Sequence, residues 1–190
     1  MTSSGTTSEP DVVDVLSTDH REFLGLVAEI RAESDPAARR ELTDTLIAEL
    51  VRHSVAEEMF VYPTIKDAVP NGKDATDHDA AEHKQLEALM KKLESADPAS
   101  PEFLEHLSGL EAVLRDHVQD EEGEQFPQLR RAVSREQLVA LAGKVETAKK
   151  ISPTRPHPLS PNNQLFHKTV GAGVGLVDRL RDTLTGRATG

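Results

Sequence analysis

One unusual pattern occurs twice in this chain and restricts its fold more than any other feature. The first copy runs from His53 to Pro63 and the second from His117 to Pro127, and both read H-x-x-x-E-E-x-x-x-[YF]-P. The two copies lie 64 positions apart. Because an internal repeat marks one supersecondary unit used twice, each copy is expected to belong to an equivalent element of the fold.

A second correspondence lengthens the repeat toward the N-terminus. At nearly the same offset, Asp19-His20 corresponds to Glu82-His83. Each unit therefore has one histidine in its first segment and an H-x-x-x-E motif in its second. A helical hairpin fits this order, and two hairpins make four helices.

The hydrophobic pattern predicts helices throughout. Apolar residues recur at steps of three and four, no run alternates as a strand does, and aromatic residues make up only 3% of the chain. Asp35-Pro36 and Ser100-Pro101 each supply an N-cap followed by proline. We expect helices over residues 12–32, 37–62, 76–93 and from 101 onward. The predicted fold is all-α, an antiparallel four-helix bundle with a C-terminal helical and extended tail.

The chain is expected to divide into four parts. Residues 1–11 should be a disordered N-terminus, 12–131 the bundle, 132–150 an additional helix, and 151–190 a Pro-rich strap with an amphipathic tail segment. The sequence Ser134-Arg-Glu-Gln137 has the form of a capping box for the additional helix. Prolines 153, 156 and 158 argue against a helix in the strap.

Composition excludes several classes of protein. The net charge of −11 and the lack of a basic stripe argue against a nucleic-acid partner. No apolar run approaches the roughly 18 residues of a membrane span. The N-terminal residues do not resemble a secretory signal, so a cytoplasmic protein is expected. With no cysteine, any metal must be held by His, carboxylate or Tyr.

The spacing places polar side chains on apolar helix faces. Four residues advance a helix by about 400°, so the His and the Glu of each H-x-x-x-E motif lie one turn apart on one face. A single inward histidine is usually an ordinary core residue. Two buried carboxylates among four imidazoles, however, are costly unless a cation neutralises them. The predicted metal ligands are His20, His53, Glu57, His83, His117 and Glu121.

The ligand types leave iron, manganese and zinc open. Six ligands from four helices exceed the needs of a tetrahedral zinc site, and a central glutamate can bridge two ions. These residues therefore favour a site with two metal ions.

The order of the motifs, from one His through H-x-x-x-E to a second His and a second H-x-x-x-E, resembles the hemerythrin-like HHE family over about residues 12–131. The resemblance implies a four-helix bundle around two non-haem iron ions, which are bridged by carboxylates and an oxo or hydroxo group. It assigns bridging roles to Glu57 and Glu121, and terminal roles to His20, His53, His83 and His117.

Two departures from the oxygen-carrying hemerythrins bear on function. The carriers have H-x-x-x-x-D on the fourth helix, where this chain has Glu121 and Glu122. They also have two histidines four residues apart on the third helix, where this chain has Asp79 before His83. Fewer imidazoles would leave a coordination position for water, peroxide or another small ligand, so redox chemistry is expected rather than reversible oxygen carriage.

Four further residues are candidates for additional ligands or for hydrogen-bond partners of the ligands: Tyr62, Asp79, Glu58 and Glu122. Tyr62 either packs before a helix-breaking proline or ligates ferric iron through its phenolate. Glu58 and Glu122 are expected to accept hydrogen bonds from imidazole N–H groups. His78, turned by about 100° from Asp79, is expected at the surface.

Two functions follow as hypotheses. The first is a di-iron protein that binds or transforms a small oxidant (dioxygen, hydrogen peroxide or nitric oxide), with catalase-like decomposition of peroxide as its enzymatic form and a role in oxidative stress. The alternative is an iron-buffering or iron- and oxygen-sensing regulatory module that acts through a protein partner. The same bundle can host either function, so turnover of a substrate is what would distinguish them.

Overall fold

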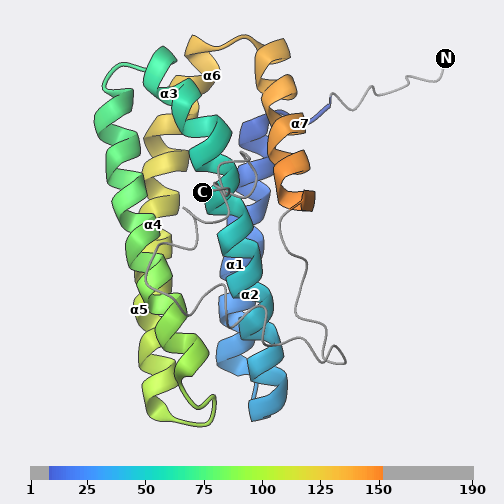
Figure 1. The fold of residues 1–190 in the computed structure, drawn as a ribbon, viewed down its shortest axis with the longest axis vertical. Helices are drawn as coiled ribbons and strands as arrows, with labels where there is room; N and C mark the ends of the chain where they lie inside the picture. The colour runs from blue at the N-terminus through green and yellow to red at the C-terminus, as the bar shows by residue number, and fades with distance from the viewer. Residues whose placement is uncertain (1–8, 152–190) are drawn as a thin grey trace, which may run out of the picture.

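The structure is a computed structural model that describes residues 9–151, and in that range every regular element is a helix. Four long helices form a bundle, namely α1 (Val12–Ala32), α2 (Pro36–Ala56), α4 (Gly72–Ser95) and α5 (Pro101–Asp120) (Figure 1). Both α1 and α4 pack against α2 and α5. The predicted four-helix bundle is confirmed. Apart from residue 151, which is helical, the predicted strap and tail segment lie outside the described residues.

Two short π-helical segments continue the second and fourth helices at equivalent positions of the repeat. The first, η1 (Glu57–Val61), leads from α2 into α3 (Tyr62–Ala68), and the second, η2 (Glu121–Gln125), leads from α5 into α6 (Phe126–Ala132). Each segment begins at the glutamate of an H-x-x-x-E motif. Single π-helical turns are rare and occur often at functional sites.

These π-helical turns correct the expectation that a proline breaks the helix after Tyr62. The N–H of Tyr62 bonds to the carbonyl of Glu57, five residues earlier, and Pro63 then lies in the first turn of α3. Proline lacks an N–H group and clashes with the carbonyl four residues before it. The wider turn relieves this conflict, so the helix continues to Ala68.

Side-chain caps fix the helix starts. Asp11 and Asp14 form a reciprocal capping box at the start of α1, with both hydrogen bonds 3.0 Å long. The predicted caps Asp35 and Ser100 accept backbone N–H groups at the starts of α2 and α5. Such caps satisfy N–H groups that the helix itself leaves unpaired.

The turn into α4 is tighter than expected. Asn71 adopts a left-handed conformation with φ of 59°, and α4 begins directly after it at Gly72 instead of at the expected Thr76. A Cβ atom at Gly72 would lie 2.2 Å from the carbonyl oxygen of Ile65. Only glycine permits this close approach, and it brings α4 directly against α3.

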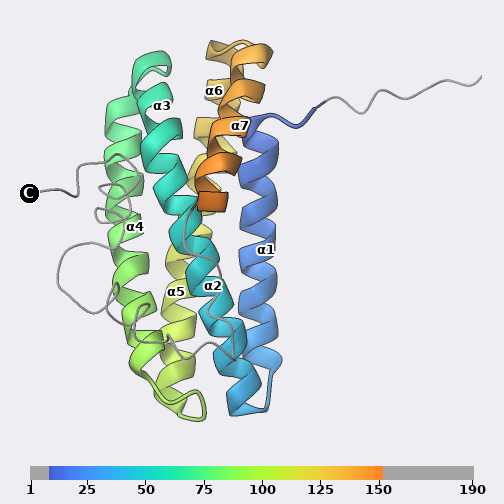
Figure 2. The same cartoon turned by 45° about the vertical axis from the view of Figure 1, so that its right-hand side comes forward.

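A further helix, α7 (Arg135–Ile151), lies along the outside of the bundle against α1 and α2 (Figure 2). The N–H of Gln137 donates to the hydroxyl of Ser134, and the side chain of Gln137 accepts from the N–H of Ser134. The predicted capping box therefore starts this helix. Its inner face buries Leu138, Leu141 and Val145.

The apolar core consists of two clusters with a polar layer between them. One cluster includes Phe23, Leu50 and Leu114, and the other includes Leu16 and Phe126 together with residues of α7. His20 lies between Leu16 and Phe23 in α1, which places the predicted ligands at the junction. Among the described residues, no helix has both the length and the apolar character to cross a membrane.

Candidate metal centre

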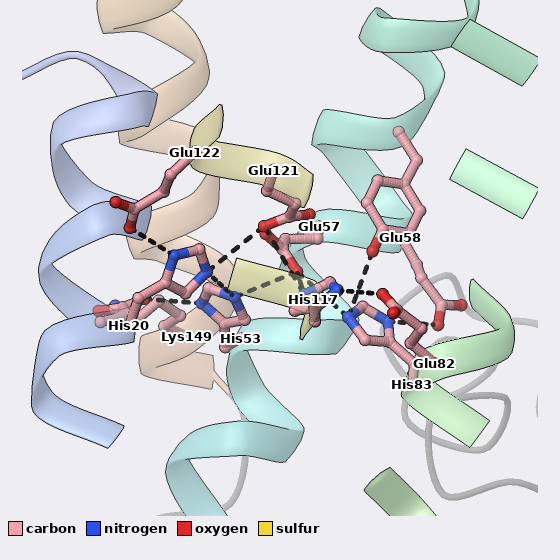
Figure 3. Close-up of polar contacts among 12 residues, drawn as sticks. His20, His53, Glu57, Glu58, Glu82, His83, His117, Glu121, Glu122 and Lys149 are labelled. Atoms are coloured by element: carbon pink, nitrogen blue, oxygen red, sulfur yellow. Dashed lines mark hydrogen bonds and ion pairs between the residues drawn. The ribbon is translucent and has the colours of Figure 1, made fainter. Parts of the chain in front are cut away.

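The six predicted ligands point toward one another (Figure 3), and they lie in the polar layer between the two apolar clusters. Each of the six is at most 3% exposed. They come from α1, α2, α4 and α5 and from the first residues of η1 and η2. Every described long helix of the bundle thus contributes to one buried site.

Glu57 faces three imidazoles from three different helices. Its Oε2 lies 3.1 Å from Nε2 of His53, 3.4 Å from Nε2 of His83 and 4.0 Å from Nε2 of His117. One carboxylate oxygen thus lies among imidazole nitrogens from three helices, a set of donors that suits a metal ion.

Glu121 holds the equivalent place in the second repeat. Its Oε2 lies 3.4 Å from Nε2 of His20 and 3.6 Å from Nε2 of His117. The Nε2 atoms of His20 and His53 are 3.3 Å apart. Five residues place one ligand atom each within 4.8 Å of all the others, and they are His20, His53, Glu57, His117 and Glu121. His83 lies beside them, in contact with Glu57 and with the ring of His117.

The outer nitrogens of two imidazoles contact the motif of the opposite hairpin. Nδ1 of His20 donates to Glu122 at 2.8 Å, and Nδ1 of His83 donates to Glu58 at 3.2 Å. Each histidine of a first helix is therefore oriented by the residue that follows the ligand glutamate. The expected role of Glu58 and Glu122 as acceptors from imidazole agrees with these contacts.

The other two imidazoles are oriented from within their own hairpins. Nδ1 of His53 donates to Asp19 and Nδ1 of His117 donates to Glu82, both at 3.1 Å. In all four histidines Nδ1 is thus bound to a carboxylate and Nε2 faces the centre, as in metal sites whose ligands are held by outer hydrogen bonds. The sequence reasoning missed these roles of Asp19 and Glu82, although the repeat had paired the two residues.

The two central carboxylates lie close to imidazole nitrogens but complete no hydrogen bond. Both oxygens of Glu57 and both oxygens of Glu121 are buried and meet no hydrogen-bond geometry, and the same is true of Nε2 of His117. Buried polar atoms without partners are rare and costly, and an ion or water that the coordinates lack is a usual reason for them. A bound cation would satisfy all five atoms, so these residues fit a metal ion.

In the metal-free site, protons supply part of the missing positive charge. Burial lowers the pKa of His53, but the charge of Glu57 and the hydrogen bond to Asp19 outweigh it and raise that pKa to about 10. Burial likewise lowers the pKa of His117, but Glu121 and Glu82 raise it to about 9. The site therefore favours cations so strongly that it holds protons where a metal would bind.

Aromatic rings stack on the histidines of the first helix in each hairpin. Phe126 stacks on His20 with ring centres 5.9 Å apart, and Tyr62 stacks on His83 with ring centres 5.6 Å apart. The hydroxyl of Tyr62 lies 3.2 Å from Nε2 of His83, the nitrogen that faces the centre. Burial and the nearby carboxylates hold the pKa of Tyr62 well above its ordinary value. The half of the centre with His83 thus has the phenol of Tyr62, where the half with His20 has the phenyl ring of Phe126.

Asp79 is buried one turn before His83 and bonds to a residue that the sequence reasoning did not consider. Its Oδ1 accepts from Nε2 of Gln125 at 2.8 Å, and its Oδ2 has no hydrogen-bond partner. Burial and the charge of Glu121 raise the pKa of Asp79 to about 7. Asp79 thus lies beside the cluster, while the side chain of neighbouring His78 is 60% exposed, as expected.

The comparisons with known proteins agree with this geometry. The sequence model of the hemerythrin HHE cation-binding domain family matches residues 11–129. An uncharacterised hemerythrin-like protein of Schizosaccharomyces pombe is 29% identical over 174 residues, which cover 91% of this chain and 86% of that protein.

Two further relatives are more distant. A DNA nickase of a Nostoc species is 27% identical over 139 residues, which cover 73% of this chain but only 39% of the nickase. The crystal structure of a hemerythrin HHE cation-binding domain-containing protein from Mycobacterium kansasii superposes with a TM-score of 0.67 at 20% identity. That match covers 90% of this chain and 99% of the other.

Proposed function

The chain belongs to the hemerythrin HHE cation-binding family, and on this premise we propose that its buried centre holds two iron ions that react with a small oxidant. The observation that carries the proposal is the pair of buried glutamates, Glu57 and Glu121, whose four oxygens lack hydrogen-bond partners. Two carboxylates of this kind among four imidazoles suit two cations better than one.

The contacts support a division of the ligands into two sets. His20 and His53 lie together, with Nε2 atoms 3.3 Å apart, and His83 and His117 lie together, with ring centres 4.9 Å apart. We assign one imidazole pair to each ion and Glu57 and Glu121 to both. Iron would supply reversible electron transfer to and from the oxidant.

The surroundings select the substrate. Apolar clusters lie on two sides of the centre, with Phe23, Leu50 and Leu114 in one and Leu16 and Phe126 in the other, and they would keep bulk water out. A small neutral oxidant avoids the cost of carrying charge into this interior. Hydrogen peroxide, dioxygen and nitric oxide meet this condition.

Among these we propose hydrogen peroxide, which is disproportionated so that two molecules yield two of water and one of dioxygen. Asp79 stands where the oxygen carriers have a second histidine on the third helix. The ion held by His83 and His117 would therefore have one imidazole fewer than in the carriers and would leave a position for an exogenous ligand. Tyr62 could donate its hydroxyl hydrogen beside that position, and Asp79, which is buried one turn before His83 with an unsatisfied Oδ2, could accept a proton there.

The test combines iron analysis with oxygen evolution. We expect about two iron ions per chain after reconstitution, and oxygen evolution on addition of peroxide once free iron is chelated. His117→Ala serves as the comparison, because its imidazole approaches both glutamates. Two results together would contradict the proposal: oxygen evolution no faster than in this variant, and an oxygenated spectrum that reverses under vacuum. They would indicate an oxygen carrier instead of an enzyme.

A second function, sensing of iron or oxygen, is favoured by one contact. Lys149 of α7 binds Asp19, which holds His53, so the centre is linked to the helix that leads into residues 152–190. A change in metal load could therefore be transmitted toward the C-terminus. Protease cleavage within residues 152–190 that depends on iron, without peroxide turnover, would favour this function.

The nickase relative does not lead us to propose DNA cleavage. Only 39% of that protein is matched, so most of it has no counterpart here. The net charge of −11 also repels a phosphate backbone.

A further inference from the structure

A pocket of about 580 Å³ lies at the turn from α3 into α4, where Val69, Pro70 and Asn71 line it. Its charged and titratable lining residues are Asp74, His78, Asp120 and Glu124, and no lysine or arginine lines it. Such a concentration of negative charge attracts cations and repels anions.

At the rim of this pocket, His78 lies between two carboxylates from different helices. Its Nε2 is 3.5 Å from Oε1 of Glu82 on α4 and 3.5 Å from Oδ2 of Asp120 on α5. One ligand atom from each residue lies within 4.8 Å of the others, which is a spacing that a divalent cation can bridge. The other oxygen of Glu82 accepts from Nδ1 of His117, a member of the buried centre.

A second observation points inward from the same pocket. Gln125 lines the pocket, yet its residue is only 6% exposed and its Oε1 has no hydrogen-bond partner. Its Nε2 donates to Asp79, which is fully buried and whose Oδ2 also lacks a partner. Asp79 in turn offers a ligand atom within 4.8 Å of one from His117. The side chains of Gln125 and Asp79, each with an unsatisfied oxygen, therefore connect the pocket with the buried centre.

We propose that this pocket is the entry port through which a divalent cation, ferrous iron in the cell, reaches the centre. His78, Glu82 and Asp120 bind the hydrated ion at the rim. Oε1 of Gln125 and Oδ2 of Asp79 then replace water molecules as the ion moves toward Glu121 and His117. Stepwise replacement matters because a bare ion cannot enter a low-dielectric interior without large loss of hydration. The inference rests on the proposed metal centre and adds its route of loading.

The rim can be removed without touching the buried centre. In the full chain, the double variant His78→Ala/Asp120→Asn should take up ferrous iron at least fivefold more slowly, measured anaerobically by chelating unincorporated iron at successive times. Its final iron content and its thermal midpoint should equal those of the wild type. A rim that only delivers iron changes the rate and leaves the end point unchanged.

A matched control lies at the other end of α5, the helix that carries Asp120. Glu102 and His106 form an exposed contact on α5, with Nε2 3.4 Å from Oε1. Glu102→Gln/His106→Ala removes the same two kinds of group and should load at the wild-type rate. Equal slowing of both variants would indicate a general charge effect and overturn the port. Unchanged loading of the rim variant, or a lower final iron content, would also overturn it.

Manganese tests the rim separately from the iron centre. Added Mn²⁺ should broaden the amide NMR signals of residues 74–78 in the iron-loaded chain, beyond any broadening that iron itself causes, and should not do so in the rim variant. If the chain takes up no iron, the proposed centre fails, but the same titration of the metal-free chain still tests the rim. If Mn²⁺ broadened no signals in either the iron-loaded or the metal-free chain, the contacts of His78 would be ordinary ion pairs and the proposed cation site at the rim would be wrong.

Discussion

Lys149 on α7 binds both carboxylate oxygens of Asp19, with Nζ 2.6 Å from Oδ1 and 2.8 Å from Oδ2. Asp19 also accepts the hydrogen bond from Nδ1 of His53. The family match ends at residue 129, so α7 lies beyond it and still reaches the metal centre through one carboxylate. The equivalent carboxylate in the other hairpin, Glu82, has the exposed His78 as its neighbour instead. The two halves of the centre therefore differ in the groups around the ligands, because a lysine contacts Asp19 and a histidine contacts Glu82.

Lys149→Met should destabilise the protein by about 1–3 kcal/mol, because it leaves the mostly buried Asp19 with one partner fewer. Methionine keeps most of the apolar stem of lysine, so the loss of stability measures the contribution of the ammonium charge. Urea unfolding of the metal-free full chain would measure it. Lys150→Met, at the neighbouring exposed position, should change stability little. Equal losses of stability from both substitutions would show that the contact between Lys149 and Asp19 does not stabilise the fold.

Removing either central glutamate should remove metal. Glu57→Ala and Glu121→Ala should each lose at least one iron ion per chain, because each carboxylate is placed to serve both ions. Iron analysis after removal of loosely bound metal would measure the loss. Glu136→Ala, a carboxylate on the exposed face of α7, is the control and should retain full loading. A double variant lacking Glu57 and Glu121 that still bound two iron ions would refute the ligand assignment.

Iron removal should lower stability. A ligand that binds only the folded chain adds its linkage free energy to folding, about 2.7 kcal/mol when the free metal is 100 times its dissociation constant. The unsatisfied oxygens of Glu57 and Glu121 in the metal-free centre act in the same direction. Thermal midpoints with and without iron would measure the difference, and coincident midpoints would contradict a metal held by the buried cluster.

Much of the fold follows from periodicity and from the repeat. Caps at Asp35 and Ser100 and the capping box at Ser134 have local causes, so the sequence predicts them correctly. The π-helical segments could not be predicted in this way, because Pro63 normally indicates a helix end. Continuation past it depends on the wider turn, in which Tyr62 bonds five residues back instead of four.

The metal centre, too, could be predicted from the sequence only in part. The inward direction of His20 and Glu57 follows from their spacing among apolar residues, whereas their partners depend on which helices are neighbours. Asp19 precedes His20 by one position and is turned by about 100° from it, toward α2 and α7. Lys149 lies outside the repeat, so no pattern within the repeat could associate it with the centre.

The metal-free protein should lose stability as pH rises from about 6.5 through about 9 to 10. The folded-state pKa values of His117 and His53 are raised to about 9 and about 10, against an ordinary value of 6.5. A group whose folded pKa is raised contributes stability that is complete below the unfolded pKa and is lost as pH rises through the folded pKa. Urea unfolding at pH 6, 8 and 10 would show the trend.

The iron-loaded protein provides the contrast in this pH series. Metal binding requires neutral imidazoles, so the free energy of binding grows as pH rises and partly offsets the loss seen without metal. The difference in stability between the two forms should therefore widen from pH 6 to pH 8. A metal-free form that gained stability up to pH 10 would contradict the protonated histidines.

The phenol of Tyr62 marks one half of the centre as different from the other. Its hydroxyl lies 3.2 Å from Nε2 of His83, whereas Phe126 occupies the equivalent place beside His20. Since phenylalanine already stacks on imidazole in the second repeat, Tyr62→Phe should fold. It should lose no more than the 0.5–1.5 kcal/mol typical of one hydrogen bond, measured by urea unfolding of the metal-free chain.

The same substitution separates three roles for Tyr62. As a hydrogen-bond donor beside the exogenous ligand, Tyr62 stabilises charge that develops on peroxide oxygen, so Tyr62→Phe should keep two iron ions and slow oxygen evolution by roughly tenfold or more. A phenolate ligand would instead give a visible charge-transfer band that disappears with the hydroxyl. A ring that only packs would leave both rate and spectrum unchanged. We expect the slower rate without loss of a band, because the equivalent ring in the second repeat, Phe126, stacks on His20 in the same way and has no oxygen to offer a metal.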